Sequence, residues 1–326
     1  MNENATLEWE QVRQQVDALK KEIARVIVGQ DAIVESMLVA LLCNGHCLIV
    51  GLPGLAKTLL VSTLGQILGL SFNRIQFTPD LMPMDILGSQ ILQDAGGAHR
   101  AFEFVRGPVF ANLLLADEIN RTPPKTQSAL LEAMQEKQVT VAGKTLLMET
   151  PFIVYATQNP IEHEGTYPLP EAQLDRFFFN LLIDYPSMDE ERQIVLQTTG
   201  HEIPQVRPVL TPSDVAALQK AVLDVPVPDH VLDTILRLVH ASRPDSELAD
   251  DYIKRYVAWG AGPRASQNLT RAAKALALLR GQSAASVEEV LAVAPPVLRH
   301  RIIPNYNATG EGVSVEAIVK HLLDAV

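Results

Sequence analysis

The sequence lacks the features that mark secreted, membrane-spanning or disulfide-stabilised proteins. Its 326 residues include only two cysteines, Cys43 and Cys47, which is too few for a disulfide framework. No uninterrupted apolar run approaches the roughly 18 residues that a membrane span needs. The N-terminus, Met1-Asn2-Glu3-Asn4, is acidic and polar rather than a secretory signal. We therefore expect a cytoplasmic protein with no membrane partner.

Clusters of lysine and arginine are also missing. The net charge is −11, and the excess lies in residues 1–200, with 24 acidic against 14 basic residues; residues 201–326 carry 14 against 13. Without a basic stripe, counterion release cannot drive broad nucleic-acid binding. We expect no nucleic-acid partner.

The order of apolar segments predicts an α/β fold in the first 200 residues. Short buried-type runs begin at Cys47, Arg74, Leu113, Phe152 and Phe178, and helical segments separate them. Apolar runs alternating with helices are typical of a parallel sheet that helices cover on both faces.

Two stretches do not fit a plain doubly wound sheet, and the chain changes character after residue 200. Residues 86–105 and 138–148 alternate around glycine-containing turns, which predicts two β-hairpin insertions. Beyond a proline-containing linker, Thr211 is expected to open the first of several helices, with Pro212 at its first position. We predict a nucleotide-binding core in residues 1–200 and a small all-helical domain in 201–326.

A phosphate-binding loop is predicted at Gly51-Leu52-Pro53-Gly54-Leu55-Ala56-Lys57-Thr58, between a buried strand and a helix. Backbone N–H groups at the start of such a helix point at an anion. In this pattern Lys57 reaches the β- and γ-phosphates and Thr58 holds Mg²⁺. Glycine usually precedes the lysine; the methyl group of Ala56 is harmless there if the backbone at this position is already helical. The candidate nucleotide-binding residues here are Gly51, Pro53, Gly54, Leu55, Ala56, Lys57, Thr58 and Leu59.

A small apolar cluster precedes the second predicted helix. Val28 and Gly29 belong to it, and Gly29 suits a turn. The cluster is a candidate lining for an adenine pocket, with ordinary packing at a helix end as the equally weighted alternative.

Acidic and amide side chains follow two later strands. The run Leu113-Leu114-Leu115-Ala116 ends in Asp117 and Glu118, which places both acids at the carboxyl edge of the sheet, beside the loop. Asp117 is a candidate Mg²⁺ ligand, and Glu118 a candidate base for the attacking water. Asn159 ends the next strand, where its amide is a candidate contact for the γ-phosphate or the water.

Two arginines are candidates for offsetting charge in the transition state. Arg176 follows Leu174-Asp175, and we interpret it as an arginine finger inserted into a neighbouring subunit's site. Arg264 opens a helix in the second domain, where it is expected to reach back to the γ-phosphate.

With these motifs in order, the chain resembles AAA+ ATPases of the MoxR family. The resemblance spans roughly residues 20–310 and is carried most specifically by segments 74–81, 107–110, 116–121 and 169–177. It implies an AAA+ P-loop sheet with two hairpin insertions and a helical lid. It also implies that Asp117 and Glu118 form the Walker B pair.

For the remaining residues, the resemblance implies that Asn159 is sensor 1, Arg176 the finger and Arg264 sensor 2. The family implies a Mg-dependent ATPase that forms a hexameric ring. Such rings remodel or mature protein complexes, often metalloenzymes, with a von Willebrand factor A domain partner.

Three alternatives stay open. A magnesium-chelatase-type subunit carries the same hairpins and hydrolyses ATP. A nucleic-acid-directed motor shares the fold, since a fold does not fix a function. A nucleotide-gated scaffold would bind ATP with little turnover.

Overall fold

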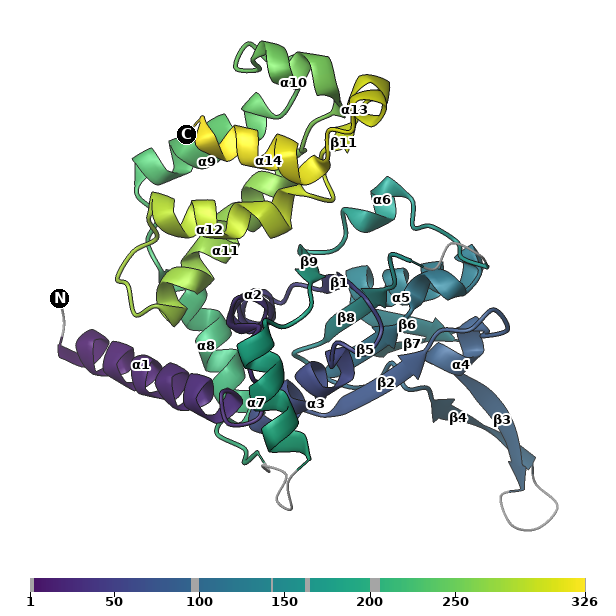
Figure 1. Cartoon of the computed structure of the whole chain (residues 1–326). Helices are drawn as coiled ribbons and strands as arrows, with labels where there is room; N and C mark the ends of the chain where they lie inside the picture. Colours follow the sequence, from purple (N-terminus) through teal and green to yellow (C-terminus); the bar gives the residue numbers. More distant parts are fainter. Residues whose placement is uncertain (1–2, 95–99, 142, 162–164, 200–205, 326) are drawn as a thin grey trace.

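The computed structural model describes residues 3–94, 100–141, 143–161, 165–199 and 206–325. At its centre lies a five-stranded parallel sheet with the strand order β2-β5-β8-β1-β9. The predicted parallel sheet is therefore confirmed (Figure 1). Its strands are β1 (Cys47–Gly51), β2 (Phe72–Gln76), β5 (Leu113–Asp117), β8 (Ile153–Gln158) and β9 (Phe179–Ile183).

Successive strand residues face opposite sides of this sheet, and each side has its own apolar cluster. In β5, Leu115 joins the cluster shared with α2 and α3, whereas Leu114 joins the cluster shared with α5. Both side chains are fully buried, as the continuous apolar run predicted. The helices of this part are α1 (Glu3–Ile23), α2 (Asp31–Leu42), α3 (Lys57–Ile67), α4 (Pro83–Leu87), the 3₁₀ turn η1 (Ile119–Arg121), α5 (Pro124–Glu136), α6 (Glu171–Leu174) and α7 (Met188–Thr198).

Both predicted hairpins are present as separate two-stranded sheets. The first pairs β3 (Gly88–Asp94) with β4 (Arg100–Arg106), and the second pairs β6 (Gln138–Val141) with β7 (Lys144–Leu147). The first extends away from the sheet (Figure 1). The tip residues 95–99 and Ala142 lie outside the described residues.

A helical region follows α7, as predicted. It opens at Thr211, whose side chain accepts a hydrogen bond from the Asp214 backbone N–H, with Pro212 at the first helical position. One short antiparallel pair, β10 (Val257–Trp259) with β11 (Ile303–Pro304), adds to the expected helices. These helices are α8 (Pro212–Asp224), α9 (Asp229–Ala241), α10 (Asp251–Tyr256), α11 (Pro263–Leu279), α12 (Val287–Leu298), α13 (Tyr306–Glu311) and α14 (Val315–Asp324).

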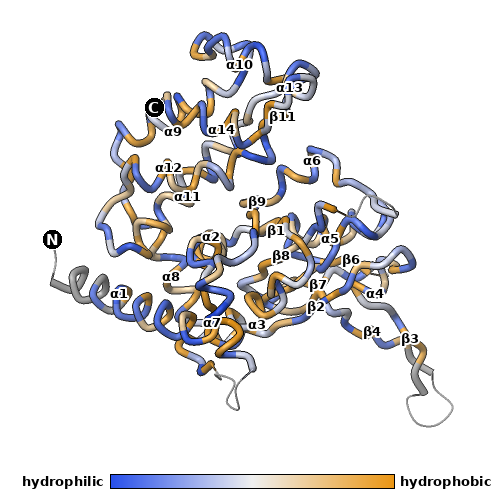
Figure 2. The backbone as a smooth tube through the Cα atoms, in the orientation of Figure 1, coloured by the Kyte–Doolittle hydropathy of each residue, from blue (hydrophilic) through white to orange (hydrophobic). Residues whose placement is uncertain are grey.

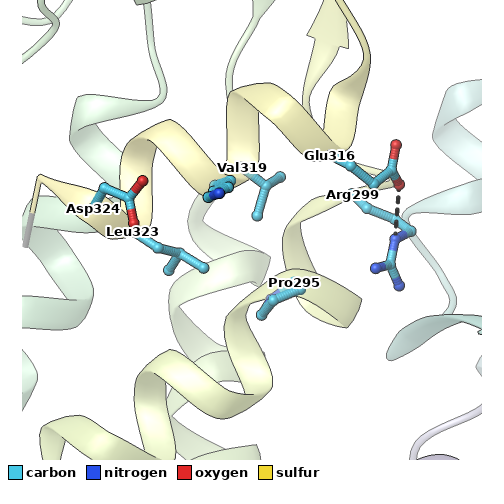
Figure 3. Close-up of a pocket in the computed structure, with 7 residues that line it drawn as sticks. Pro295, Arg299, Glu316, Val319, Leu323 and Asp324 are labelled. Atoms are coloured by element: carbon cyan, nitrogen blue, oxygen red, sulfur yellow. Dashed lines mark hydrogen bonds and ion pairs between the residues drawn. The ribbon is translucent and has the colours of Figure 1, made fainter.

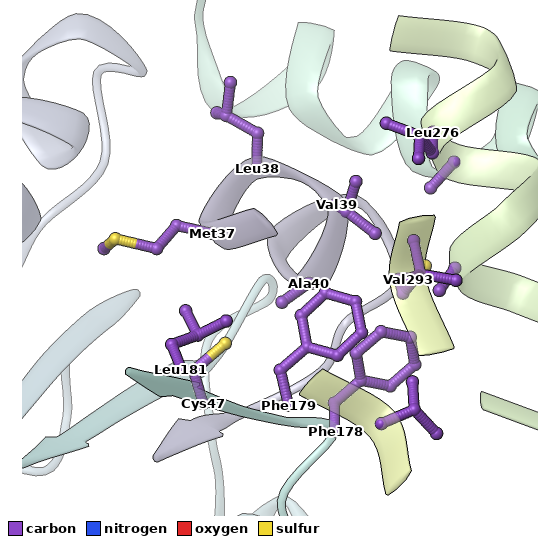
Figure 4. Packing of buried hydrophobic residues seen from close by; sticks show 14 of the residues in the cluster. Met37, Leu38, Val39, Ala40, Cys47, Phe178, Phe179, Leu181, Leu276 and Val293 are labelled. Carbon is purple, nitrogen blue, oxygen red and sulfur yellow. The ribbon is translucent and has the colours of Figure 1, made fainter. Parts of the chain in front are cut away.

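The helical region shares one apolar core with the sheet. Phe178 and Phe179 at the start of β9 face α2, with Leu276 of α11 and Val293 of α12 beyond it (Figure 4). Hydrophobic and hydrophilic residues alternate along these helices (Figure 2), as expected where one helix face packs inward. The predicted boundary between residues 200 and 201 lies within 200–205, outside the described residues.

Candidate active site

The phosphate-binding loop lies where predicted, between the end of β1 and the start of α3 at Lys57. The condition under which the Ala56 methyl group would be harmless is not met. Ala56 has φ 54° and ψ 23°, which is left-handed rather than helical backbone. A side chain in this region costs roughly 1–2 kcal/mol relative to right-handed backbone. The loop therefore holds a strained residue immediately before its lysine.

Lys57 lies over its own loop and close to the two acids. Its Nζ donates to the carbonyl oxygens of Gly51 at 2.5 Å and Leu52 at 3.1 Å. Partial burial lowers the pKa of the ammonium, whereas the charges of Asp117 and Glu118 act to raise it. The cation thus lies in a partly desolvated position, where its attraction for an anion is stronger than in water.

Asp117 at the end of β5 is held from two neighbouring strands. Thr157 Oγ1 on β8 donates to its Oδ1 at 2.6 Å, and Arg74 on β2 donates to its Oδ2 from Nε at 3.2 Å and from Nη2 at 2.7 Å. The carboxylate is therefore fixed at the carboxyl edge, as the sequence indicated, but it carries a guanidinium partner.

Glu118 is oriented by its backbone and by two side chains. Its φ of 57° is left-handed, and its backbone N–H donates to Thr157 Oγ1 at 2.8 Å. The carboxylate accepts from Gln76 Nε2 at 2.8 Å and from Arg121 Nη1 at 3.1 Å. A carboxylate with fixed direction beside the loop suits a base that must take a proton from one water.

Asn159 completes this edge of the sheet. Its side chain is 5% exposed, and its Oδ1 accepts from the Ile161 backbone N–H at 3.3 Å. Its buried Nδ2 has no hydrogen-bond partner among the described residues. An unpaired buried donor is costly, so this amide fits a site whose ligand supplies the acceptor.

The Val28-Gly29 turn lies between α1 and α2. Gly29 has φ 68°, and a Cβ there would lie 2.5 Å from Glu190 Oε1 of α7. The positive φ favours glycine here, whereas the Glu190 carboxylate is the end of a flexible side chain that could move aside. The adenine-binding role of this turn stays a prediction.

The two arginines lie together at the opposite, amino edge of the sheet. Arg176 precedes β9, and together with Arg264 and Arg271 it lines a cavity of about 210 Å³ next to Asn44 and His46, which precede β1. Arg176 forms no hydrogen bond or ion pair with any described residue. Within the described part of the chain its guanidinium therefore has no ion-pair partner.

Arg264 does not reach back toward the loop of its own chain. Its Nη1 lies 2.7 Å from Asp175 Oδ2, because α11 begins beside the turn that precedes β9. Lys57 lies at the other end of the parallel strands. In this arrangement Arg264 therefore lies away from the loop of its own chain, and its contact with a γ-phosphate stays a prediction.

Sequence reasoning assigned no role to four residues that hold the acids, namely Arg74, Gln76, Arg121 and Thr157. The available signal was the pair of polar side chains at positions 74 and 76, on either side of the buried Ile75 in the edge strand β2. Both lie on β2, which pairs with β5 in the register Gln76 to Asp117.

Together, the sheet order, the loop before α3 and the acids at the end of β5 define a P-loop nucleotide hydrolase. Residues 46–179 match the family described as "ATPase family associated with various cellular activities (AAA)", and residues 250–322 match the AAA lid domain. Within the described part of the chain, no helix is long and apolar enough to cross a membrane.

Similar proteins narrow the assignment. Chaperone MoxR1 of Mycobacterium tuberculosis is 48% identical over 94% of this chain and 80% of its own length. Protein MoxR of Paracoccus denitrificans is 30% identical over 92% and 91%. The crystal structure of a candidate ATPase from Cytophaga hutchinsonii superposes with a TM-score of 0.93, at 40% identity over 99% of this chain and 97% of that one. The chain belongs to the MoxR family of AAA ATPases.

Proposed function

We propose that this ATPase hydrolyses ATP in sites that two adjacent copies build jointly within a hexameric ring. One observation carries the proposal: the catalytic groups lie at opposite edges of one sheet. Lys57, Glu118 and Asn159 lie at the carboxyl edge, and Arg176 and Arg264 lie at the amino edge. No single copy can bring both sets to one phosphate, whereas a head-to-tail ring brings them together at every interface.

Within such a site each residue has a distinct task. Lys57 binds the β- and γ-phosphates, and Glu118 takes the proton from the attacking water, which the unpaired Asn159 amide helps to place. Arg176 and Arg264 of the adjacent copy offset the charge that develops on the transferred phosphoryl group. Hydrolysis then depends on assembly, because an isolated copy cannot bring its own Arg176 and Arg264 to the phosphate at its loop.

Thr58 and Asp117 fit a Mg²⁺ ion. Both offer hard oxygen ligands, and the Thr58 hydroxyl makes no hydrogen bond with any described residue. When bound, the ion would neutralise charge on the phosphate oxygens. Among the described residues no group of three or more His, Cys, Asp or Glu side chains could hold a metal alone. That agrees with a Mg²⁺ site in which the nucleotide supplies part of the shell.

We propose that turnover is used to remodel a protein complex, with metalloenzymes as clients and a von Willebrand factor A domain protein as partner. The name of the chaperone relative supports a protein client. The β3–β4 hairpin adds physical support, because it exposes apolar side chains, with Phe102 69% and Leu92 50% exposed. Such surface suits contact with a protein.

The test compares Glu118→Gln, Arg176→Ala and an equimolar mixture of the two. Each variant alone should lose about 10³-fold or more in the rate of phosphate release while still binding ATP. In mixed rings, an intact loop from the Arg176 variant meets an intact Arg176 from the Glu118 variant, so activity should return. A mixture that stays inactive, or an Arg176 variant that cannot bind ATP, contradicts sites shared between copies.

A further inference from the structure

Three consecutive residues of the helical region contact the segment from Asp175 to Asn180, which contains Arg176 and the start of β9. Arg299, His300 and Arg301 follow α12, and each contacts backbone carbonyls at or beside β9. Arg299 Nη1 donates to the Asn180 carbonyl at 2.5 Å, and His300 Nε2 lies 3.1 Å from the Phe177 carbonyl oxygen. Arg301 makes the most contacts of the three, and they lie next to Arg176.

Arg301 encloses the residues on both sides of Arg176. Its Nε donates to Asp175 Oδ1 at 2.8 Å, and its Nη2 donates to the carbonyls of Phe177 at 2.6 Å and Asp175 at 3.3 Å. Its Nη1 donates to the Val297 carbonyl at 2.5 Å within its own helix end. One planar guanidinium thus fixes the backbone before and after Arg176, a geometry that a lysine cannot reproduce.

Because Arg301 is buried, breaking its contacts with this segment would cost free energy. Its side chain is only 2% exposed, and burial lowers its pKa to about 10, which still leaves it charged at neutral pH. A buried cation needs a paired charge and saturated hydrogen bonds. Among the described residues, Asp175 is the one carboxylate in contact with it. The same carboxylate pairs with Arg264 through its other oxygen.

Arg176, in contrast, has no partner of its own among the described residues. The direction of its side chain is therefore set by the backbone from which it projects, and Arg301 holds that backbone. We propose that Arg301 is a positioning residue for the arginine finger, through which the helical region controls whether a copy can complete its neighbour's site. This inference rests on the proposed function, since it takes Arg176 to act on an adjacent copy.

Arg299 provides a matched comparison. It has the same side chain, lies two residues away and also donates to β9, but its charge is paired within the helical region with Glu316 at 3.1 Å (Figure 3). It borders a cavity of about 260 Å³ with Pro295, Val319 and Leu323. It does not contact Asp175, so its loss should leave the finger turn in place.

The experiment measures ATP hydrolysis of Arg301→Lys, Arg301→Gln and Arg299→Gln in the full chain. Both Arg301 variants should lose at least about tenfold in kcat with KM for ATP within about twofold, because the loop that binds ATP belongs to the other edge. Arg299→Gln should keep kcat within about threefold. Equal kcat losses in the Arg299 and Arg301 variants would assign both residues to general packing and overturn the proposal.

Mixing two variants distinguishes a loss of finger positioning from general damage to the fold. Arg301→Gln mixed with Glu118→Gln should regain activity, because the Arg301 variant still offers an intact loop to the other variant's Arg176. Mixed with Arg176→Ala it should stay inactive, because both then lack a working finger. Activity from the second mixture, or none from the first, contradicts the proposal.

If the Arg301 variants do not fold, Asp175→Glu replaces them in both mixtures. This change keeps a carboxylate for the buried Arg301 cation but moves it by one methylene, and Asp175 is 38% exposed in its side chain, so there is room for the longer residue. Failure of this inference can be told from failure of the proposed function. If Arg176→Ala itself hydrolyses ATP normally, the shared site is wrong; if Arg176→Ala is inactive and the Arg301 and Asp175 variants are normal, only the positioning role is wrong.

Discussion

The Arg74 guanidinium on β2 lies 2.7 Å from Oδ2 of Asp117, the carboxylate that we assign to Mg²⁺. Arg74 is 46% exposed and Asp117 14%, so the pair is partly screened by solvent. Pairs of this kind contribute about 0–1 kcal/mol. An ion that binds Asp117 must displace this guanidinium or share the carboxylate with it.

Replacing Arg74 with alanine should therefore lower the Mg²⁺ requirement. Loss of up to about 1 kcal/mol of competing interaction corresponds to roughly a fivefold fall in the Mg²⁺ concentration that gives half-maximal ATP hydrolysis. Titration of the ATPase rate with Mg²⁺ measures it. The control is Arg106→Ala on the first hairpin, which removes an exposed pair with Glu149, a residue that follows the second hairpin. A higher Mg²⁺ requirement in Arg74→Ala would mean that Arg74 supports the site instead.

The left-handed backbone of Ala56 predicts an unusual response to substitution. Glycine adopts φ 54° without strain, although it also gains freedom in the unfolded chain. Ala56→Gly should therefore keep or raise the melting temperature and keep ATP affinity. Ala56→Val, whose branched side chain suits this conformation worst, should lower both. Thermal unfolding and equilibrium ATP binding measure the pair; similar losses in both variants would show that the methyl group itself is needed.

The sequence was informative where local pattern decides the structure. The apolar run 113–116 could only be a buried strand, which placed Asp117 and Glu118 at its carboxyl end, and the strand–loop–helix order placed Lys57. The backbone of Ala56 could not be settled in this way, because alanine ordinarily adopts right-handed backbone and the folded loop holds it in the left-handed region. Residue propensities therefore located the strand, the loop and the helix, but not the strained backbone at Ala56.

Contacts distant in sequence were beyond local patterns. Asp175 pairs with Arg264, 89 residues away, and with Arg301, 126 residues away. No periodicity links such positions, so local patterns could not indicate that Arg264 pairs with Asp175. Arg301 had no visible function until its burial and its partners were known.

Buried His46 predicts a pH dependence of stability. Its Nδ1 accepts from the Val154 backbone N–H at 3.0 Å, so Nε2 must carry the proton and donate to the Met134 carbonyl at 3.1 Å. A charged imidazolium could not accept the first bond. Burial lowers the pKa of His46 to about 4, below its ordinary value of 6.5. Between these two pKa values the imidazole is protonated in the unfolded chain but neutral in the folded protein. The free energy of unfolding therefore falls as the pH drops from 6.5 toward 4.

His46→Gln tests this assignment, because glutamine can accept and donate at similar positions without titrating. Between about pH 7.5 and about pH 5, the wild type should lose roughly 2 kcal/mol more unfolding free energy than His46→Gln. Denaturant unfolding at the two pH values measures the difference. His300, also buried with a lowered pKa, contributes equally to both proteins and cancels. If the unfolding free energies of the two proteins depended equally on pH, protonation of His46 would not destabilise the folded protein.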